Sequence, residues 1–114
     1  MRSVNAKILE DILVCAVEGG INYWASIELY TRDRVVLVDD MDGKEYEVTP
    51  EVVARGFSLL GHGKGYAKNR EAPAWFVKYW GRMYADALAD VFDFDITDAD
   101  VIVQAALFNE IVYG

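Results

Sequence analysis

The sequence has little of the residue types on which covalent catalysis and cross-linking depend. Its 114 residues include one cysteine, Cys15, and one histidine, His62. A disulfide within the chain is therefore impossible, which suits a reducing cytoplasm, and no Ser-His-Asp or Cys-His set has support from residue spacing. Because Cys15 follows an apolar stretch, we expect a buried small side chain there. These shortages predict a protein that is not an enzyme and has no cofactor, although a small hydrolase or transferase built on a carboxylate pair stays an open alternative.

Long apolar runs are also missing. No run reaches the roughly 18 residues that a membrane-spanning helix needs, and the N-terminal residues do not have the pattern of a signal peptide. Hydrophobic residues nevertheless make up 54% of the chain, which is enough for one core in a chain of this length. We therefore expect a single domain over residues 1–114, located in the cytoplasm and making no contact with a membrane.

Positive charge is scarce and unevenly distributed. The 11 basic and 19 acidic residues give a net charge of −8, so direct binding to nucleic acid is not expected. Five of the basic residues nevertheless gather in the segment 62–82, which has one acidic residue, Glu71. This cationic island consists of Lys64, Lys68, Arg70, Lys78 and Arg82. A positive island in an acidic chain indicates a binding surface for an anionic group.

Hydrophobic periodicity and turn residues predict an α+β fold, in which a small three-stranded antiparallel sheet packs with about four helices in the order α-β-β-β-α-α-α. Asn5 is expected to cap the first helix, and Gly19 and Gly20 to end it in the left-handed conformation. Thr49 and Thr97 are expected to cap the second and fourth helices. The predicted helices cover 6–18, 50–60, 73–91 and 98 onwards, and the predicted strands cover 23–30, 34–39 and 44–48.

The end of the first predicted helix has the composition of a ligand pocket. We name the run Glu18-Gly19-Gly20-Ile21-Asn22-Tyr23-Trp24 the diglycine motif. Two glycines expose backbone N–H groups, Glu18 and Asn22 supply hydrogen bonds, and Tyr23 and Trp24 supply stacking faces, a set that suits a nucleobase or ribose. The alternative is a helix end beside core aromatics. Neighbouring side chains in a strand point to opposite faces, so at most one of the two rings can be buried if the other face is wet.

A second candidate is the glycine-rich loop Gly61-His62-Gly63-Lys64-Gly65. It lacks the spacing and the Ser or Thr of a nucleoside triphosphatase phosphate loop. A non-hydrolytic anion site remains possible here, in which free backbone N–H groups act together with His62, Lys64, Lys68 and Arg70. A mobile surface loop is the alternative.

A third candidate surface combines aromatic, basic and acidic residues. The run from Trp75 to Tyr84 is mostly core by its helical spacing, but a neighbouring stripe mixes aromatic and cationic side chains that suit a protein partner. The acids that follow resemble the start of a calcium loop but lack its glycine and glutamate, so no metal is expected. A solvated helix end is the default interpretation. The candidate partner-binding residues are Trp75, Lys78, Arg82, Asp86, Asp90, Asp93 and Asp95.

Both ends of the chain resemble a widespread family of small acidic tailed-phage and prophage proteins. The resemblance lies in the diglycine motif and in the ending Asp98-Ala99-Asp100-Val101-Ile102-Val103-Gln104-Ala105-Ala106-Leu107-Phe108-Asn109-Glu110-Ile111-Val112-Tyr113-Gly114. It implies a phage accessory protein rather than a housekeeping enzyme, and such proteins often act on host defence systems.

Two hypotheses of function follow. In the first, the protein sequesters a nucleotide-derived immune signal. The base or sugar binds at the diglycine motif, and the phosphate binds at Lys64, Lys68 and Arg70. These segments share one pocket, either within one chain or across a homo-oligomer interface. In the second, it inhibits a host defence protein, such as a CRISPR effector or a nuclease, by presenting acidic faces that mimic DNA.

Overall fold

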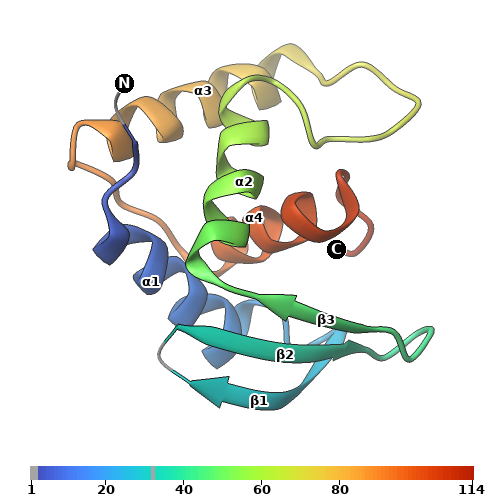
Figure 1. Cartoon of the computed structure of the whole chain (residues 1–114). Coiled ribbons are helices and arrows are strands. Elements are labelled where there is room, and N and C mark those ends of the chain that lie inside the picture. Colours follow the sequence, from blue (N-terminus) through green and yellow to red (C-terminus); the bar gives the residue numbers. More distant parts are fainter. Residues whose placement is uncertain (1–2, 32) are drawn as a thin grey trace.

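The chain folds into a small antiparallel sheet covered on one side by helices, in the order that the sequence predicts. The computed structural model describes residues 3–31 and 33–114. The described elements are α1 (Ala6–Cys15), the π-helical turn η1 (Ala16–Gly20), β1 (Ala25–Thr31), β2 (Arg34–Asp39), β3 (Glu45–Val48), α2 (Pro50–Gly61), α3 (Ala74–Leu88) and α4 (Ile96–Phe108) (Figure 1). The predicted α+β class and element order are confirmed.

The sheet is a meander in which β2 lies between β1 and β3, antiparallel to both. Val35 and Leu37 of β2 are fully buried, so the centre of the sheet contributes directly to the core. The first strand begins later than predicted, at Ala25. Tyr23 and Trp24 lie instead in a turn, in which the N–H groups of Trp24 and Ala25 donate to the carbonyl of Ile21 at 3.1 and 3.0 Å.

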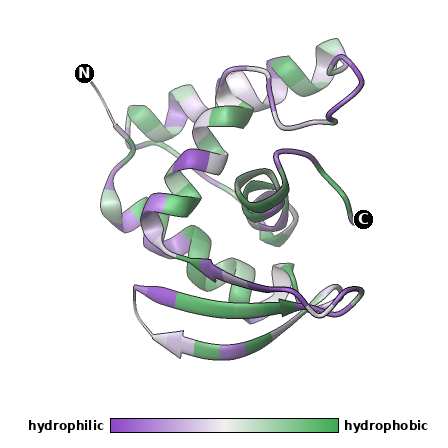
Figure 2. Ribbon diagram, turned by 45° about the vertical axis from the view of Figure 1, so that its right-hand side comes forward, coloured by the Kyte–Doolittle hydropathy of each residue, from purple (hydrophilic) through white to green (hydrophobic). Residues whose placement is uncertain are grey.

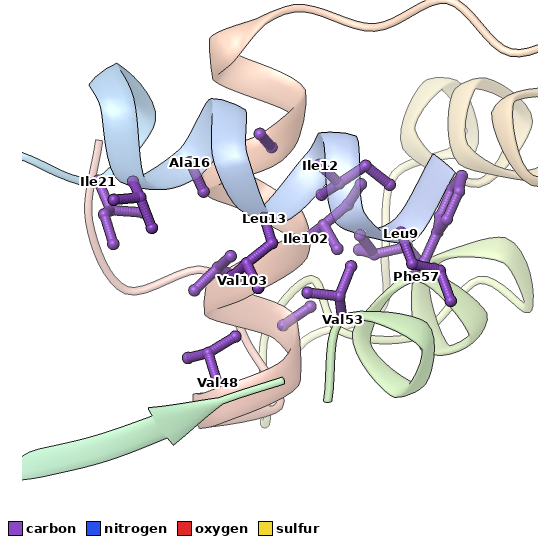
Figure 3. Close-up of a cluster of buried hydrophobic side chains, with 14 of the residues drawn as sticks. Leu9, Ile12, Leu13, Ala16, Ile21, Val48, Val53, Phe57, Ile102 and Val103 are labelled. Carbon is purple, nitrogen blue, oxygen red and sulfur yellow. The ribbon is translucent and has the colours of Figure 1, made fainter. Parts of the chain in front are cut away.

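Helix α4 lies at the centre of the molecule and is buried on nearly every side. It packs against α2, η1 and α1, and Figure 3 shows Ile102 and Val103 pointing toward side chains of α1 and α2. Hydrophobic colouring covers most of α4 in Figure 2, which agrees with the apolar residues that this helix buries, Ala99, Ile102, Val103, Ala105 and Ala106. Val112 lies beyond the end of this helix and is exposed.

Close packing, rather than left-handed backbone, explains the glycine at the end of η1. Neither Gly19 nor Gly20 has a positive φ, so the predicted left-handed helix end is wrong. A Cβ atom on Gly20 would lie 2.8 Å from the carbonyl oxygen of Ile96 and 3.4 Å from the amide nitrogen of Asp100. Gly20 therefore allows η1 to approach the first turn of α4 at backbone distance.

The helix caps are only partly those expected. Asn5 accepts from the N–H of Lys7, and Thr49 accepts from the N–H of Val52, as predicted. The cap of α4 is Asp95 instead of Thr97, because the helix begins two residues earlier than predicted. Asp95 and Asp98 form a capping box, in which each side chain accepts the backbone N–H of the other.

No helix among the described residues is long and apolar enough to cross a membrane.

Candidate functional site

Three adjoining hollows form a trough along one side of the molecule. The cationic hollow, of about 430 Å³, lies at the loop between α2 and α3. The aromatic hollow, of about 340 Å³, shares Tyr66 with it. The tyrosine hollow, of about 320 Å³, shares Thr97, Val101 and Ile111 with the aromatic hollow. In Figures 1 and 2 the α2–α3 loop and the C-terminal segment lie on the same side of the molecule, and the N–H of Ile111 donates to the carbonyl of Tyr66 at 3.1 Å.

Three residues of the cationic island come together in the cationic hollow. Lys64, Lys68 and Arg70 line it, and the guanidinium of Arg70 lies 5.5 Å from the centre of the Tyr66 ring. Acids partly offset this charge, because Glu71 also lines the hollow and Lys68 forms an exposed 3.5 Å ion pair with Glu110. An exposed pair of this kind contributes little stability, so an incoming anion can replace it.

Two of the backbone N–H groups in the glycine-rich loop are not free to bind an anion. The N–H of Gly63 donates to the carbonyl of Leu60 at 3.0 Å, and the N–H of Lys64 donates to the carbonyl of Leu59 at 2.9 Å. With Gly63 at φ 78°, this is the Schellman motif that ends α2. The expected use of these two backbone N–H groups is therefore wrong, and the loop contributes cationic side chains.

The rest of the cationic island lies elsewhere. Lys78 and Arg82 are exposed on α3 and are not among the residues that line the cationic hollow. His62 lines a neighbouring hollow of about 300 Å³, which also contains Arg55 and shares Lys64 with the cationic hollow. The Nδ1 atom of its ring lies 2.6 Å from the carbonyl oxygen of Ser58, within its own helix end. The structure thus places His62 beside the predicted anion site, outside the cationic hollow.

The aromatic hollow combines exposed rings with a buried aromatic base. Phe76 and Trp80 are buried and Tyr66 packs edge-on against Phe76, with 4.9 Å between ring centres. Trp75 is 65% exposed and Tyr79 is 42% exposed, so both keep ring surface open to a ligand. This arrangement confirms that the predicted core stripe of α3 contains Phe76 and Trp80. It also leaves a neighbouring aromatic stripe free to bind.

Two carboxylates line the aromatic hollow at the first turn of α4. Asp95 is exposed, whereas Asp98 is 7% exposed. The hydroxyl of Tyr79 donates to Asp98 at 2.6 Å. Burial, together with the charge of Asp95, raises the pKa of Asp98, although the hydrogen bonds from Tyr79 and from the Asp95 N–H oppose this shift. Burial and the bond to Asp98 also raise the pKa of Tyr79. The default interpretation of these acids as a solvated helix end is therefore wrong for Asp98.

In the diglycine motif, one of the two aromatic rings is buried and the other is exposed. Trp24 is 2% exposed: its indole N–H donates to Asp100 at 2.8 Å and its ring stacks on Tyr113, with 5.1 Å between centres. Its predicted role as a stacking face for a ligand is wrong. Tyr23 is 57% exposed and donates to Asp100 at 2.5 Å. Burial and the bond to Asp100 raise the pKa of Tyr23 to about 12.

The remaining residues of the diglycine motif divide in the same way. Gly19 and Gly20 line the tyrosine hollow together with Tyr23 and Asp100. Glu18 and Asn22 are exposed and are not among the residues that line any of the three hollows. The first hypothesis expected the diglycine motif and the cationic residues to share one pocket. Within this chain they do not share one. They line the two ends of the trough, with the aromatic hollow between them.

A buried polar cluster joins the diglycine motif to the C-terminal ending. Gln104 is fully buried, and its amide donates to Asp100 at 2.9 Å while its oxygen accepts the N–H groups of Val112 and Tyr113, each at 2.8 Å. The hydroxyl of Tyr113 donates to Asp39 at 2.8 and 2.9 Å, and this raises the pKa of Tyr113 to about 12. The cluster closes the tyrosine hollow on its inner side.

The sequence interpretation did not identify Asp100 and Gln104 as a pair. Their i, i+4 spacing within an otherwise apolar helix was the available signal, because two polar residues on one face of a buried helix need partners. Tyr66, which joins two hollows, directly follows the glycine-rich loop and was also missed.

The acids proposed for partner binding differ in their exposure. Asp90, Asp93 and Asp95 are exposed around the α3–α4 connection, whereas Asp86 is half-buried. Asp93, Asp95 and Asp98 line a shallow hollow of about 300 Å³. Within residues 3–31 and 33–114, no group of three or more His, Cys, Asp or Glu side chains is arranged to hold a metal ion.

Comparison with known proteins gave no match, since no family model, curated protein or solved structure is significantly similar to this chain. Its function therefore has to be inferred from the residues of the trough.

Proposed function

We propose that this protein binds a nucleotide-derived small molecule in the trough and holds it without chemical change. The observation that supports this is the junction at Tyr66, where a hollow lined by Lys64, Lys68 and Arg70 meets a hollow lined by aromatic rings. A nucleotide has the matching pair of groups, because an anionic phosphate and a planar base are joined through a sugar. A free phosphate would use the first hollow alone.

Each hollow supplies a contact of useful size. Charge-assisted hydrogen bonds from Lys or Arg to phosphate contribute about 1.5–3 kcal/mol when they are well formed, and less here because the side chains are exposed. Stacking of a base on an aromatic side chain contributes about 1–3 kcal/mol, and Trp75 has an open face for it. The phosphate contact weakens as salt is added, since exposed charges are screened beyond about 10 Å at 0.1 M ionic strength.

Binding rather than turnover is favoured by the state of the titratable groups along the trough. Asp98 is held by Tyr79 and the Asp95 N–H, and Asp100 is held by Tyr23, Trp24 and Gln104. These bonds fix the carboxylates as parts of the wall. The resemblance to phage accessory proteins supplies the setting: sequestration of a signalling nucleotide in the host cytoplasm, which would antagonise a bacterial defence system.

The rival hypothesis, inhibition of a host defence protein by an acidic surface, is favoured by one observation. Asp90, Asp93 and Asp95 are all exposed around the α3–α4 connection. If this surface is the functional one, charge reversal of Asp90 and Asp93 abolishes partner binding and leaves nucleotide binding unchanged. The nucleotide hypothesis predicts the opposite sensitivity, to changes at Lys68 and Arg70.

The test is calorimetric titration of the purified protein with nucleoside monophosphates, cyclic dinucleotides and ADP-ribose at low and physiological salt. We expect at least one of them to bind, more weakly at higher salt. The double variant K68A/R70A removes two cations from the hollow, and K78A/R82A is the matched control that removes two cations from the same island outside it. We expect K68A/R70A to lower affinity by about tenfold, as for loss of about 1.4 kcal/mol. Failure of every ligand to bind, or equal loss in both variants, would refute the proposal.

A further inference from the structure

The carboxylates that line the aromatic hollow are not needed for stacking or for phosphate binding. Asp95 and Asp98 line this hollow beside Trp75 and Tyr79. A carboxylate repels phosphate, so a bound nucleotide must direct its phosphate away from them and toward Lys64, Lys68 and Arg70. The edge of the base then meets the two acids. We propose that the trough selects guanine, with Asp95 accepting hydrogen bonds from the Watson–Crick edge of the base. This inference rests on the proposed nucleotide function.

Asp95 has the accessibility and the orientation that this role needs. Its side chain is exposed, and one oxygen, Oδ1, accepts the N–H of Asp98 at 2.9 Å. This bond fixes the carboxylate at the start of α4, while each carboxylate oxygen has lone pairs for a second donor. Asp98 is less available, because Tyr79 and the Asp95 N–H already donate to it. Asp95 is therefore the carboxylate that can pair with a base.

The hydrogen-bonding pattern of the bases decides which one fits a carboxylate. Guanine presents two adjacent donors, N1–H and the exocyclic N2–H, which a carboxylate can accept together. Adenine and cytosine each place a ring-nitrogen acceptor next to one amino donor, and uracil flanks its single N–H with two carbonyl oxygens. Opposite Asp95, each of these three bases would bring an acceptor toward a negative charge. Mispaired polar groups of this kind are the source of strong discrimination between similar ligands.

A conservative variant separates base recognition from folding. Asp95 is the N-cap of α4, and Asn is as good an N-cap as Asp. The variant D95N therefore keeps the cap and the backbone bond to Asp98, but replaces one acceptor oxygen with an NH₂ group. Equal urea midpoints for the wild type and D95N would establish that the fold is preserved. D93N, at a neighbouring exposed acid that does not line the aromatic hollow, is the matched control.

The experiment compares the affinities of GMP, IMP and AMP for the wild type, D95N and D93N. IMP differs from GMP only by the absent exocyclic amino group. We expect GMP to bind the wild type about tenfold or more tightly than IMP or AMP, and we expect D95N, but not D93N, to remove most of this preference. Equal binding of the three nucleotides, or a guanine preference that D95N retains, overturns the inference and leaves the proposed function standing. If neither these nucleotides nor the wider set binds at all, the proposed function itself fails.

Discussion

The approach of Gly20 to helix α4 provides a stringent test of the fold. In the variant G20A, the added Cβ atom would lie 2.8 Å from the carbonyl oxygen of Ile96, and 3.4 Å from the amide nitrogen of Asp100. Both neighbours are backbone atoms, so the clash cannot be relieved by rotating a side chain. Overpacking of this kind destabilises proteins by about 1–3 kcal/mol. The first turn of α4 has to move, and with it Asp100.

The measurement is urea unfolding of G20A beside a control that makes the same change in open space. A Cβ atom on Gly81, within α3, would have no neighbour within 4 Å, and replacing a mid-helix Gly with Ala stabilises by about 0.5–1 kcal/mol. With an m-value of about 1.5 kcal/mol/M, a loss of about 2 kcal/mol lowers the urea midpoint of G20A by about 1.3 M, whereas the midpoint of G81A rises by about 0.3–0.7 M. A midpoint for G20A within about 0.3 M of the wild type would show that η1 and α4 do not approach as described.

Two further predictions concern the buried polar cluster and its tyrosines. Replacing Asp100 with Leu leaves the indole N–H of Trp24 unpaired in the interior and removes one of the acceptors of the Gln104 amide, which keeps the carbonyl of Tyr113 as a partner. D100L should therefore lower the unfolding free energy by about 1–3 kcal/mol, whereas D100N, whose amide can still accept one donor and bond to the Tyr23 hydroxyl, should lose about 1 kcal/mol or less. Urea unfolding that finds D100L as stable as the wild type would contradict this role. Folding raises the pKa of Tyr23 and of Tyr113 from 10.0 to about 12. As the pH rises above 10, the unfolded chain therefore releases these protons before the folded protein does. The free energy of unfolding should be unchanged below pH 10 and should fall between pH 10 and 12. Absorbance titration should find these tyrosines ionising late, and Y23F should reduce the fall in stability; if all the tyrosines ionise together near pH 10, the hydrogen bonds to Asp100 and Asp39 are absent.

The order of elements was predictable because it depends on local signals. Caps at Asn5 and Thr49, the β-branched run in β2 and the turn before β3 each act over a few residues, and the structure confirms them. Trp24 is buried and Tyr23 is exposed, which agrees with the expectation that at most one of the two rings is core, although both residues lie in a turn and not in the strand from which this was argued. These features could be identified from the chain because neighbouring residues determine them.

One error occurred where distant segments meet, and another where local hydrogen bonds already use the donors of a loop. Gly20 has the same appearance in a sequence whether it ends a helix or allows another backbone to approach, and only the position of Ile96 distinguishes the two. The glycine-rich loop has the composition of an anion site, yet its amides at Gly63 and Lys64 close the end of α2. Hydrogen bonding to the helix end removed them from the site, and a sequence pattern cannot show which donors are already used.

The sequence by itself determined the fold class, the segment in which basic residues gather and the aromatic character of α3, because composition and periodicity act along the chain. Only the tertiary structure decided that Lys64, Lys68 and Arg70 adjoin the rings of α3 through Tyr66, and that Asp100 and Gln104 join the diglycine motif to the C-terminal ending. Contacts between residues far apart in the chain depend on how the helices pack around α4, and that packing depends on the whole core rather than on any one segment.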